Sequence, residues 1–478
     1  MAFNSLDYAL FFIFVLVASW SLVRWASYRL FFLLAASVFS YMCSRKLYIL
    51  LVLIPTVVDY LTALGIAASD DPRRRKLLLG ISIALNLGLL GLFKYYDFFI
   101  TNVATGLQSI GLVPANASLP VLNLALPVGI SFYTFQTMAY VIDVYRGTWG
   151  PIKSFLNFSL VITFFPHFVA GPIVLAKELS PQFERPAELT WDRVSDGLFL
   201  IIKGLLKKTL ADWLGSNFVD NVYKDPSQFT ATEILLSTYA YSMQIYGDFS
   251  GYTDMALGSA KLLGYELPEN FRRPYLAQSV AHFWRRWHMT LSRWVREYVY
   301  FPLGGTRKGQ LRAYGNIMLT LVIMGLWHGA NWTFFWYGVI HGAMVCVNRW
   351  SNQRRKAAGL EEEVEHTGLA LLWRVFLTFQ FVSLARILFR AENLAHAERV
   401  ASRLVSGDFA LVKISWTIYA VMAGAYLIHW LPPRLVDSTR VTFRHVPAFG
   451  KGVALAAACG IAAMVKGSNP VPFIYFAF

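Results

Sequence analysis

The chain has 478 residues, of which 56% are hydrophobic and only 15% are charged, and its formal net charge is +15. Soluble globular proteins carry about 25% charged residues. This composition, with a mean hydropathy of +0.46, therefore excludes an ordinary soluble domain and predicts a polytopic membrane protein. The basic residues lie mostly in short loops between apolar runs, as expected for topology signals and headgroup contacts, and we find no nucleic-acid-binding motif.

The first part of the chain contains six predicted transmembrane segments. They are residues 8–23, 30–43, 47–67, 77–99, 125–145 and 154–175. Residues 101–123 contain no Lys or Arg and hold two prolines, which predicts a loop on the non-cytoplasmic side. Pro166 and the pair Gly171-Pro172 interrupt the end of the sixth segment.

The middle of the chain departs from this pattern. Residues 191–223 place Lys203, Lys207 and Lys208 among leucines at helical spacing, and such a helix more often lies in the membrane interface than spans the bilayer. Residues 229–263 are expected to form one long helix. Residues 278–301 are aromatic and basic, and we expect an interfacial or re-entrant segment, because irregular backbone at membrane depth is tolerated only beside protein or a water-filled cavity.

Five more apolar runs complete the expected set, at residues 314–328, 331–348, 369–389, 412–431 and 450–467. The predicted fold is an all-α polytopic membrane protein with about eleven transmembrane helices plus interfacial or re-entrant helices, in a single integral domain over residues 1–478. Loops 24–29, 70–76, 146–153, 349–356 and 434–451 carry most of the loop Lys and Arg and are expected in the cytoplasm, whereas loop 390–411 is expected outside.

Two histidines are candidates for chemistry. His328 lies in the apolar stretch GLWHGANWTFFWYG, and an ionisable residue at membrane depth is a functional candidate by default. A neutral imidazole there can remove a proton from a hydroxyl that attacks an acyl carbonyl, although a histidine that only joins two helices remains an alternative. His341 follows thirteen residues later and is expected to be structural.

The second histidine, His288, lies among arginines in FWRRWHMTLS. Arginine suits bidentate phosphate contact and indole suits stacking, so Arg285, Arg286 and Trp284 are candidates to bind a phosphate-bearing acyl donor, together with Trp327 beside His328. The alternative is an interfacial helix whose arginines reach lipid headgroups. We expect membrane lipid as a partner in either case.

The stretch YGDFSGYTDMALGS places carboxylates inside an apolar helix. Asp248 and Asp254 are six residues apart and therefore do not share a helical face. They could line a cavity, or they could form a buried network that fixes helix packing, which we favour. Tyr246 and Asn331 are further candidates to line or brace the same region. The three cysteines are far apart and lack metal-ligand spacing, so no metal site is predicted.

Three blocks of sequence resemble the membrane-bound O-acyltransferase family, in its bacterial branch that acetylates exported polysaccharides. They are YGDFSGYTDMALGSAKLLGYELPENFRRPY, FWRRWHMTLSRWVREYVYFPLGG and GLWHGANWTFFWYGVIHG. LPVGISFYTFQTMAYVIDVYRG, FFPHFVAGPI and the terminal PFIYFAF are similar to that branch as well. The resemblance covers most of the chain, and residues 246–341 form its motif-bearing core.

The resemblance implies a ring of tilted helices around a central funnel, with His328 as the intramembrane catalytic histidine and His288 as a second active-site position. It implies an enzyme of the bacterial inner membrane with no bound cofactor. The acyl group would come from acetyl-CoA or another cytoplasmic acetyl thioester and be passed outward to an exopolysaccharide such as alginate, often through a separate periplasmic acetyltransferase. Peptidoglycan O-acetylation, teichoic acid D-alanylation and non-enzymatic transport of acyl or glycan material remain alternatives.

Overall fold

The computed structural model describes residues 1, 3–43, 45–114, 116, 119–169, 171–360, 366–466 and 473–474. All regular secondary structure within these residues is helical. The chain divides into two compact units. Within the described residues, unit 1 comprises the ranges 3–189 and 259–267, and unit 2 comprises the ranges 190–258 and 268–478. The single integral domain expected from the sequence stays a prediction.

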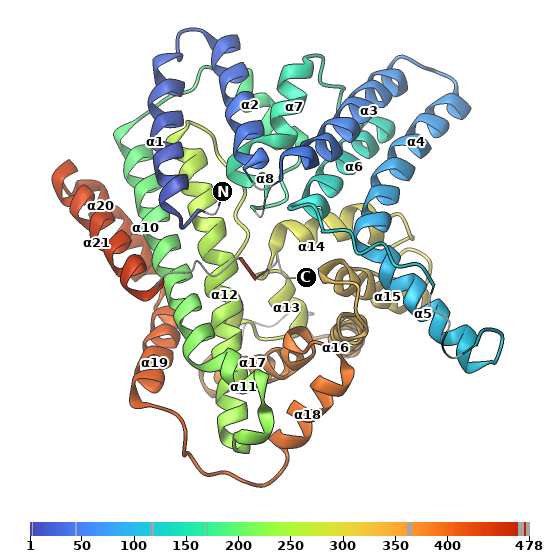
Figure 1. Ribbon diagram of the computed structural model, residues 1–478, viewed down its shortest axis with the longest axis vertical. Coiled ribbons are helices and arrows are strands. Elements are labelled where there is room, and N and C mark those ends of the chain that lie inside the picture. Colours follow the sequence, from blue (N-terminus) through green and yellow to red (C-terminus); the bar gives the residue numbers. More distant parts are fainter. Residues whose placement is uncertain are drawn as a thin grey trace. The chain divides into compact units, whose positions relative to one another are not determined.

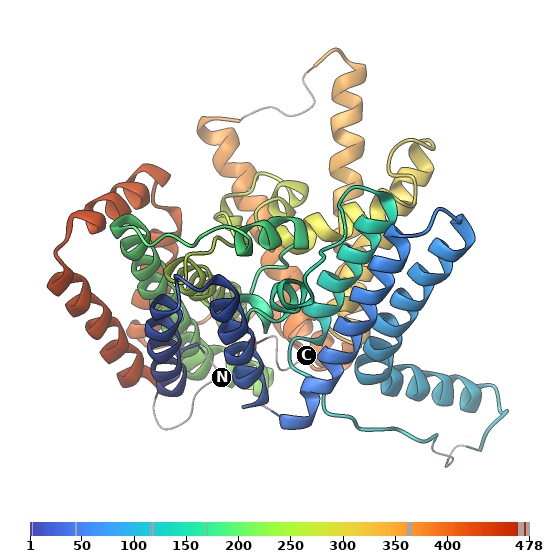
Figure 2. The same cartoon turned by 90° about the horizontal axis from the view of Figure 1, so that it is seen from above.

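Unit 1 holds the N-terminal helices. These are α1 (Leu6–Ser21), α2 (Ala26–Met42), α3 (Leu50–Ala67), α4 (Pro72–Leu90), α5 (Tyr96–Ser109), α6 (Ile130–Arg146), α7 (Phe155–Thr163), α8 (Phe165–Phe168) and α9 (Ala176–Phe183). Helices α3, α4 and α6 lie side by side (Figures 1 and 2). A buried network joins them, because Asp59 accepts hydrogen bonds from Ser82 (2.5 Å) and Asn86 (2.8 Å), and Thr137 donates to Asn86 (2.9 Å).

Unit 2 holds the helices that carry the candidate residues. They are α10 (Trp191–Leu214), α11 (Asp220–Lys224), α12 (Ala231–Leu262), α13 (Val280–Trp284), α14 (Met289–Val295), α15 (Gln310–His328), α16 (Trp332–Ala357), α17 (Gly368–Arg390), α18 (Leu394–Leu404), α19 (Trp416–Trp430), α20 (Pro433–His445) and α21 (Ala448–Lys466). The last residues of α12, 259–262, belong to unit 1.

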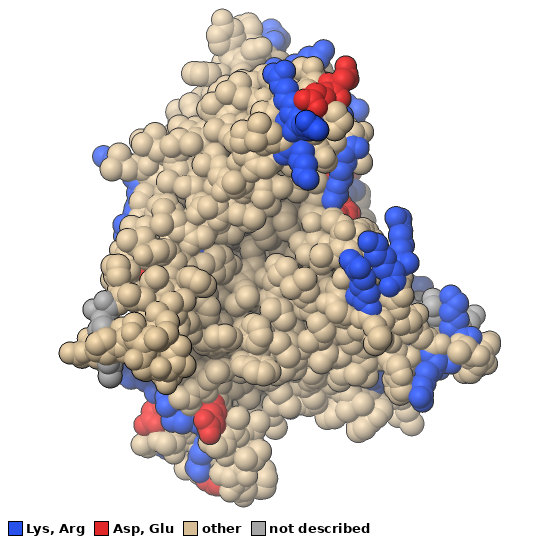
Figure 3. All heavy atoms as spheres, turned by 90° about the vertical axis from the view of Figure 1, so that its right-hand side faces the viewer, with Lys and Arg blue, Asp and Glu red and all other residues tan. Residues whose placement is uncertain are grey.

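Long apolar helices support the membrane assignment. Among the described residues, four helical stretches are long and apolar enough to cross a bilayer, namely Lys46–Ala67, Pro72–Ser109, Gly368–Arg390 and Ala448–Val465, and α1 and α2 are shorter apolar helices. Large apolar side chains such as Leu311, Trp416, Phe449 and Met464 are more than four-fifths exposed, as expected for surfaces that face lipid. On the face in Figure 3, most atoms belong to uncharged residues and Lys and Arg gather in a few clusters. The count of about eleven spans stays a prediction.

Several predicted boundaries are wrong. The expected loop 101–123 begins as helix α5, which continues from α4 through a π-helical turn at Gly91–Tyr95. The interruption predicted at the end of span 154–175 is present: α7 ends at Thr163, the short helix α8 contains Pro166, and the chain turns sharply at Gly171, where a Cβ would lie 2.4 Å from the His167 Cα. Loops 390–411 and 434–451 contain the helices α18 and α20, both short and polar enough to escape a search for apolar runs.

Helices α10 and α12 cross in close backbone contact at glycines. A Cβ on Gly204 would lie 2.5 Å from the Gly251 carbonyl oxygen, and one on Gly258 would lie 2.6 Å from the Gly197 carbonyl oxygen. Small residues at such crossings let helix backbones approach closely. The lysines of α10 reach across this crossing to carboxylates of α12. The expected interfacial position of α10 stays a prediction.

Candidate active site

His288 occupies an unusual backbone position between α13 and α14. Its φ of 43° and ψ of 55° are left-handed, a conformation that side-chain-bearing residues rarely adopt and that often marks functional sites. The neighbouring segment holds it there, since the Met289 amide donates to the Asn270 carbonyl oxygen at 3.0 Å. The Arg272 amide likewise donates to the Arg286 carbonyl oxygen at 2.9 Å. These two hydrogen bonds join residues 270–272 to residues 286–289, a pairing that the re-entrant prediction for residues 278–301 could not specify.

The side chain of Asn270 determines how the His288 ring is protonated. Its Oδ1 accepts hydrogen bonds from the Thr290 amide (3.2 Å) and the Thr290 hydroxyl (2.9 Å), and it lies 3.1 Å from His288 Nδ1. A backbone N–H can only donate, so the amide oxygen must face Thr290 and Nδ1 must carry the hydrogen. In the neutral ring Nε2 is then the nitrogen with the lone pair, the form that a general base requires.

His328 is the last residue of α15 and is 2% exposed. Aromatic rings surround it, with centroid distances of 5.0 Å to Phe389, 6.3 Å to Phe334 and 6.4 Å to Tyr337. Trp327 packs against both histidines, with its ring 5.1 Å from His328 and 5.7 Å from His288. The structure thus brings the two predicted histidines to one place, with Trp327 between them.

The arginines predicted to bind the donor lie at the surface end of this region. Arg285 is exposed, whereas Arg286 is half-buried and donates to His282 Nε2 (2.6 Å) and to the Arg272 carbonyl oxygen (3.1 Å). The charges of Arg272, Arg273 and Arg285 all act on Arg286. Arg272 and Arg273 therefore extend the predicted pair to a cluster of four arginines, in which Arg272 also pairs with Glu269 at 2.7 Å. Arg286 also positions the turn that carries His288.

Two of the other predicted residues take places that the sequence did not indicate. Trp284 is 7% exposed and packs against His341 at 5.3 Å, so it belongs to the interior and not to the arginine cluster. Asn331 caps α16, where its Oδ1 accepts from the Thr333 amide (3.0 Å) and its Nδ2 donates to the Glu392 carbonyl oxygen (2.7 Å). Their predicted roles in donor binding and in lining a funnel stay predictions.

The carboxylates of α12 form ion pairs with α10. Asp248 contacts the buried Lys208 at 2.6 Å, and Lys208 also contacts Asp212 at 2.5 Å. Asp254 contacts Lys203 at 3.1 Å and Lys207 at 2.7 Å. This is the arrangement that the bracing interpretation expects. Helix α12 runs unbroken from Ala231 to Leu262, so the two carboxylates do not meet as an acid/base pair.

Aromatic residues connect this brace to the histidines. The Tyr246 ring packs against His429 at 4.8 Å and Trp287 at 6.4 Å, and Lys207 Nζ lies 5.2 Å from its centroid. Of the terminal PFIYFAF motif, only Phe473 and Ile474 lie within the described residues. The Ile474 amide donates to Asp248 at 2.8 Å, and Phe473 packs 5.4 Å from Phe249, the ring that contacts His288 at 4.8 Å.

Sequence reasoning missed three positions of this site. Asn270 gave no signal, because its partner His288 is eighteen residues away and the two meet only through the turn. Phe389 is one apolar residue among many in α17. Arg386, in contrast, is one of two arginines in the predicted span 369–389, the other being Arg374, and the rule that singled out His328 applies to it equally.

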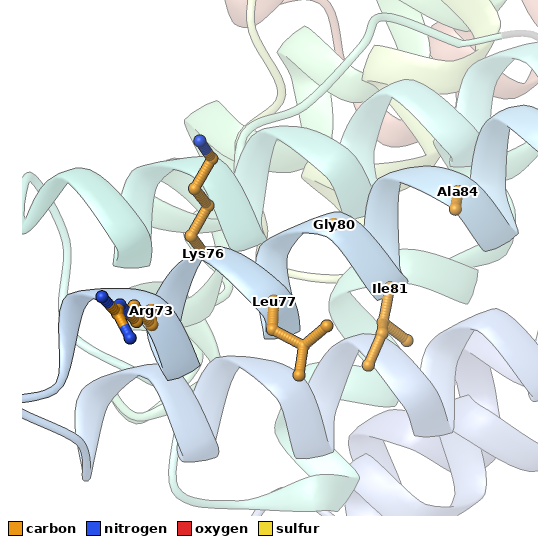
Figure 4. A pocket seen from close by; sticks show the side chains of 6 residues that line it. All are labelled: Arg73, Lys76, Leu77, Gly80, Ile81 and Ala84. Atoms are coloured by element: carbon orange, nitrogen blue, oxygen red, sulfur yellow. The ribbon is translucent and has the colours of Figure 1, made fainter.

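A surface hollow in unit 1 is lined by one face of α4, residues Arg73, Lys76, Leu77, Gly80, Ile81 and Ala84 (Figure 4). It is open and shallow, and both of its cations lie in the first turns of the helix. None of the predicted site residues lines it. We therefore place the candidate active site around His288 and His328 in unit 2.

Comparisons with known proteins identify the class. The profile of the membrane-bound O-acyltransferase family matches residues 150–387. The probable alginate O-acetylase of Pseudomonas putida is 36% identical over 393 residues, which cover 81% of this chain and 77% of that protein. The chain belongs to the membrane-bound O-acyltransferase family, and it is an all-helical membrane protein and an O-acyltransferase.

Two further relatives have other names. The peptidoglycan O-acetyltransferase of Helicobacter pylori is 34% identical over 400 residues, covering 78% of this chain and 73% of that protein. The teichoic acid D-alanyltransferase of Bacillus subtilis is 30% identical over 295 residues, covering 57% of this chain and 71% of that protein. The family resemblance expected from the sequence motifs is thus confirmed.

Proposed function

We propose that this protein is an inner-membrane O-acetyltransferase that passes acetyl groups from a cytoplasmic thioester donor across the membrane for O-acetylation of an exported polysaccharide, alginate or a similar exopolysaccharide. The names of relatives such as that in Pseudomonas putida support the acetyl group and the polymer. The apolar helices support a site within a bilayer. Donor, direction of transfer and acceptor are parts of the proposal.

The observation that carries the proposal is the pair of buried histidines joined by Trp327. In the proposed reaction an acceptor hydroxyl oxygen forms a bond to the thioester carbonyl carbon, the carbon–sulfur bond breaks, and the thiolate leaves and takes up a proton. His328 accepts the hydroxyl proton and returns it to the leaving sulfur. His288, whose lone pair is directed to Nε2 by Asn270, positions the donor or the acceptor.

The arginine cluster supports coenzyme A or a similar phosphate-bearing thioester as donor. Guanidinium groups bind phosphate oxygens through paired N–H donors, and Arg285 is exposed to provide them. The surrounding aromatic rings keep water away from the thioester and so limit its hydrolysis. In this proposal a separate periplasmic acetyltransferase receives the acetyl group and completes its delivery to the polymer.

The test supplies isotope-labelled acetyl-CoA to membranes that contain the wild-type protein, His328→Ala or His445→Ala. His445 lies at the end of α20 and outside the aromatic cluster, so its variant controls for loss of a histidine as such. We expect label on a polymer or accessory protein with wild type and H445A, and none with H328A at equal membrane insertion. Equal labelling by H328A would remove the assignment of the site and would favour transport without chemistry.

Two alternatives on the same scaffold differ only in acceptor and acyl group. Relatives are named for peptidoglycan O-acetylation and for teichoic acid D-alanylation. Labelled D-alanine that is transferred in place of acetyl would identify the second, and label recovered on muramyl sugars would identify the first. The neighbouring genes provide an independent check, since polymer synthesis genes and a carrier-protein ligase pair predict different acceptors.

A further inference from the structure

A fully buried arginine lies one helical turn from the ring that contacts His328. Arg386 is on α17 and is 1% exposed. Phe389 follows it by three residues, so both side chains share one face of the helix, and the Phe389 ring is 5.0 Å from His328. Arg386 is therefore close to the proposed reaction centre, and the proposed acyl transfer gives it no role.

The guanidinium of Arg386 has neutral neighbours only. Its Nη1 donates to the Ser242 carbonyl oxygen (3.2 Å) and to the Tyr275 hydroxyl, and its carbon lies 4.5 Å from the Trp287 ring centroid. Within the part of the chain that the structure describes, no carboxylate lies within the 4.0 Å ion-pair distance of Arg386, and Nη2 makes no hydrogen bond within 3.5 Å. The Tyr337 side chain also interacts with the guanidinium.

A purely structural role does not explain this arrangement well. Removal of a cation from water costs several kcal/mol unless opposite charge and hydrogen bonds compensate it, and apolar residues brace helices as well or better. A buried arginine with two N–H groups of Nη2 unused retains a strong attraction for a negative charge.

Other buried nitrogens without acceptors lie in the same cluster. His341 is 0% exposed, packs 4.3 Å from Tyr337 and is within range of the Arg386 charge. Neither of its ring nitrogens has a hydrogen-bond partner among the described residues, and the same holds for the Trp284 indole nitrogen, whose ring is 5.3 Å from His341. Donors from α13, α16 and α17 thus gather at one buried location with nothing in the described chain to accept from them.

From this gathering we propose that Arg386, His341 and Trp284 form a buried anion-binding subsite that holds a carboxylate or phosphate group of a substrate beside the catalytic histidines. A forked guanidinium pairs with either group through two parallel hydrogen bonds, and the indole and imidazole N–H groups contribute single donors. The proposal rests on the proposed function, because it assigns the anion to the donor or to the acceptor of the acyl transfer.

The first experiment measures binding without turnover. The purified full-length protein in detergent is heated at constant ionic strength in rising concentrations of sodium phosphate or sodium acetate. Arg386→Gln is compared with Arg390→Gln, the matched control one turn further along α17, whose guanidinium is paired with Asp220 at 2.8 Å. We expect wild type and R390Q to gain thermal stability with at least one anion, and R386Q to need at least a tenfold higher concentration.

A second variant keeps the test decisive if R386Q does not fold. Arg386→Lys retains the positive charge and loses the forked pair of donors, so we expect weaker but measurable stabilisation. The proposal is overturned if wild type gains no stability from either anion, or if a folded Arg386 variant responds as R390Q does.

Measurements of KM with different acyl donors distinguish whether the bound anion belongs to the donor or to the acceptor. If Arg386 binds a donor phosphate, R386Q raises KM for acetyl-CoA and leaves KM for acetyl-pantetheine, which lacks phosphate, unchanged. If it binds an acidic group of the acceptor, KM for both donors stays the same and only acceptor saturation shifts. Absence of label transfer by wild type would reject the proposed function, while the thermal measurement would still decide whether the subsite exists.

Discussion

Asn270→Ala removes the oxygen that holds His288 and Thr290 in place. Three hydrogen bonds end on this oxygen, and each neutral hydrogen bond contributes about 1 kcal/mol net. We therefore expect about 3 kcal/mol of local destabilisation. If about 2 kcal/mol of this raises the free energy of the transition state because the imidazole is no longer oriented, the rate of acetyl transfer decreases roughly 30-fold.

The assay compares label transfer per folded molecule with the thermal unfolding midpoint. Asn270→Asp keeps an acceptor toward Thr290 and toward Nδ1–H, so it should recover much of the activity that N270A loses. Asn316→Ala is the matched control, because Asn316 is also buried and donates to the Gly305 carbonyl oxygen at 3.1 Å, away from both histidines. We expect N316A to lose stability and keep its turnover. Wild-type turnover by folded N270A would refute the account of the ring's protonation.

Three further changes test the packing around the site. Gly204→Ala should destabilise the α10–α12 crossing by about 1–3 kcal/mol through overpacking, whereas Gly424→Ala, with nothing within 4 Å of its Cβ, should be neutral or stabilising in the same thermal scan. Asp248→Asn should cost more stability than Asp254→Asn, because its lysine is fully buried; a reversed order would contradict the bracing role. Burial raises the pKa of Asp196, but the hydrogen bonds and charges of two arginines on α20 outweigh it and hold the pKa well below its usual range. The stability that this ion pair contributes is present above about pH 4 and is lost as the pH falls further. Proteolysis of α20 in the wild-type protein should therefore become faster in acid, and the proteolysis rate of Asp196→Asn should not show this increase.

Hydropathy predicted the long helices because the bilayer imposes one requirement on all of them. A run of some twenty apolar residues satisfies every backbone group within itself, so α3, α4, α17 and α21 could be located without knowledge of their neighbours. Helices α18 and α20 escaped, because both are short and polar. Helix α18 buries only three residues, and α20 buries none and is joined to α10 by ion pairs of Arg440 and Arg444 with Asp196. The interruption of residues 154–175 was also predictable, since Pro166 and Gly171 mark it within the sequence itself.

The sequence indicated which histidines belong to the candidate site, but it did not indicate how their side chains are held. His288 and His328 could be singled out because polar rings in apolar or basic surroundings are rare, and the structure brings them together. The hydrogen bonds that orient His288 come from Asn270, and the contact of Trp327 with His288 joins the end of α15 to the turn before α14. Such contacts depend on how distant segments pair, which no local pattern of residues encodes.

The left-handed backbone at His288 affects how substitutions there must be interpreted. A replacement at His288 has two separate effects. It changes stability according to how well the new residue adopts the left-handed conformation, and it changes turnover because the imidazole is lost. For most side chains the conformation costs roughly 1–2 kcal/mol, but glycine and asparagine adopt it readily. In a saturation library the ranking by protein yield and the ranking by turnover should therefore disagree, with asparagine high in the first and low in the second. A single alanine substitution at His288 would not separate the loss of stability from the loss of turnover.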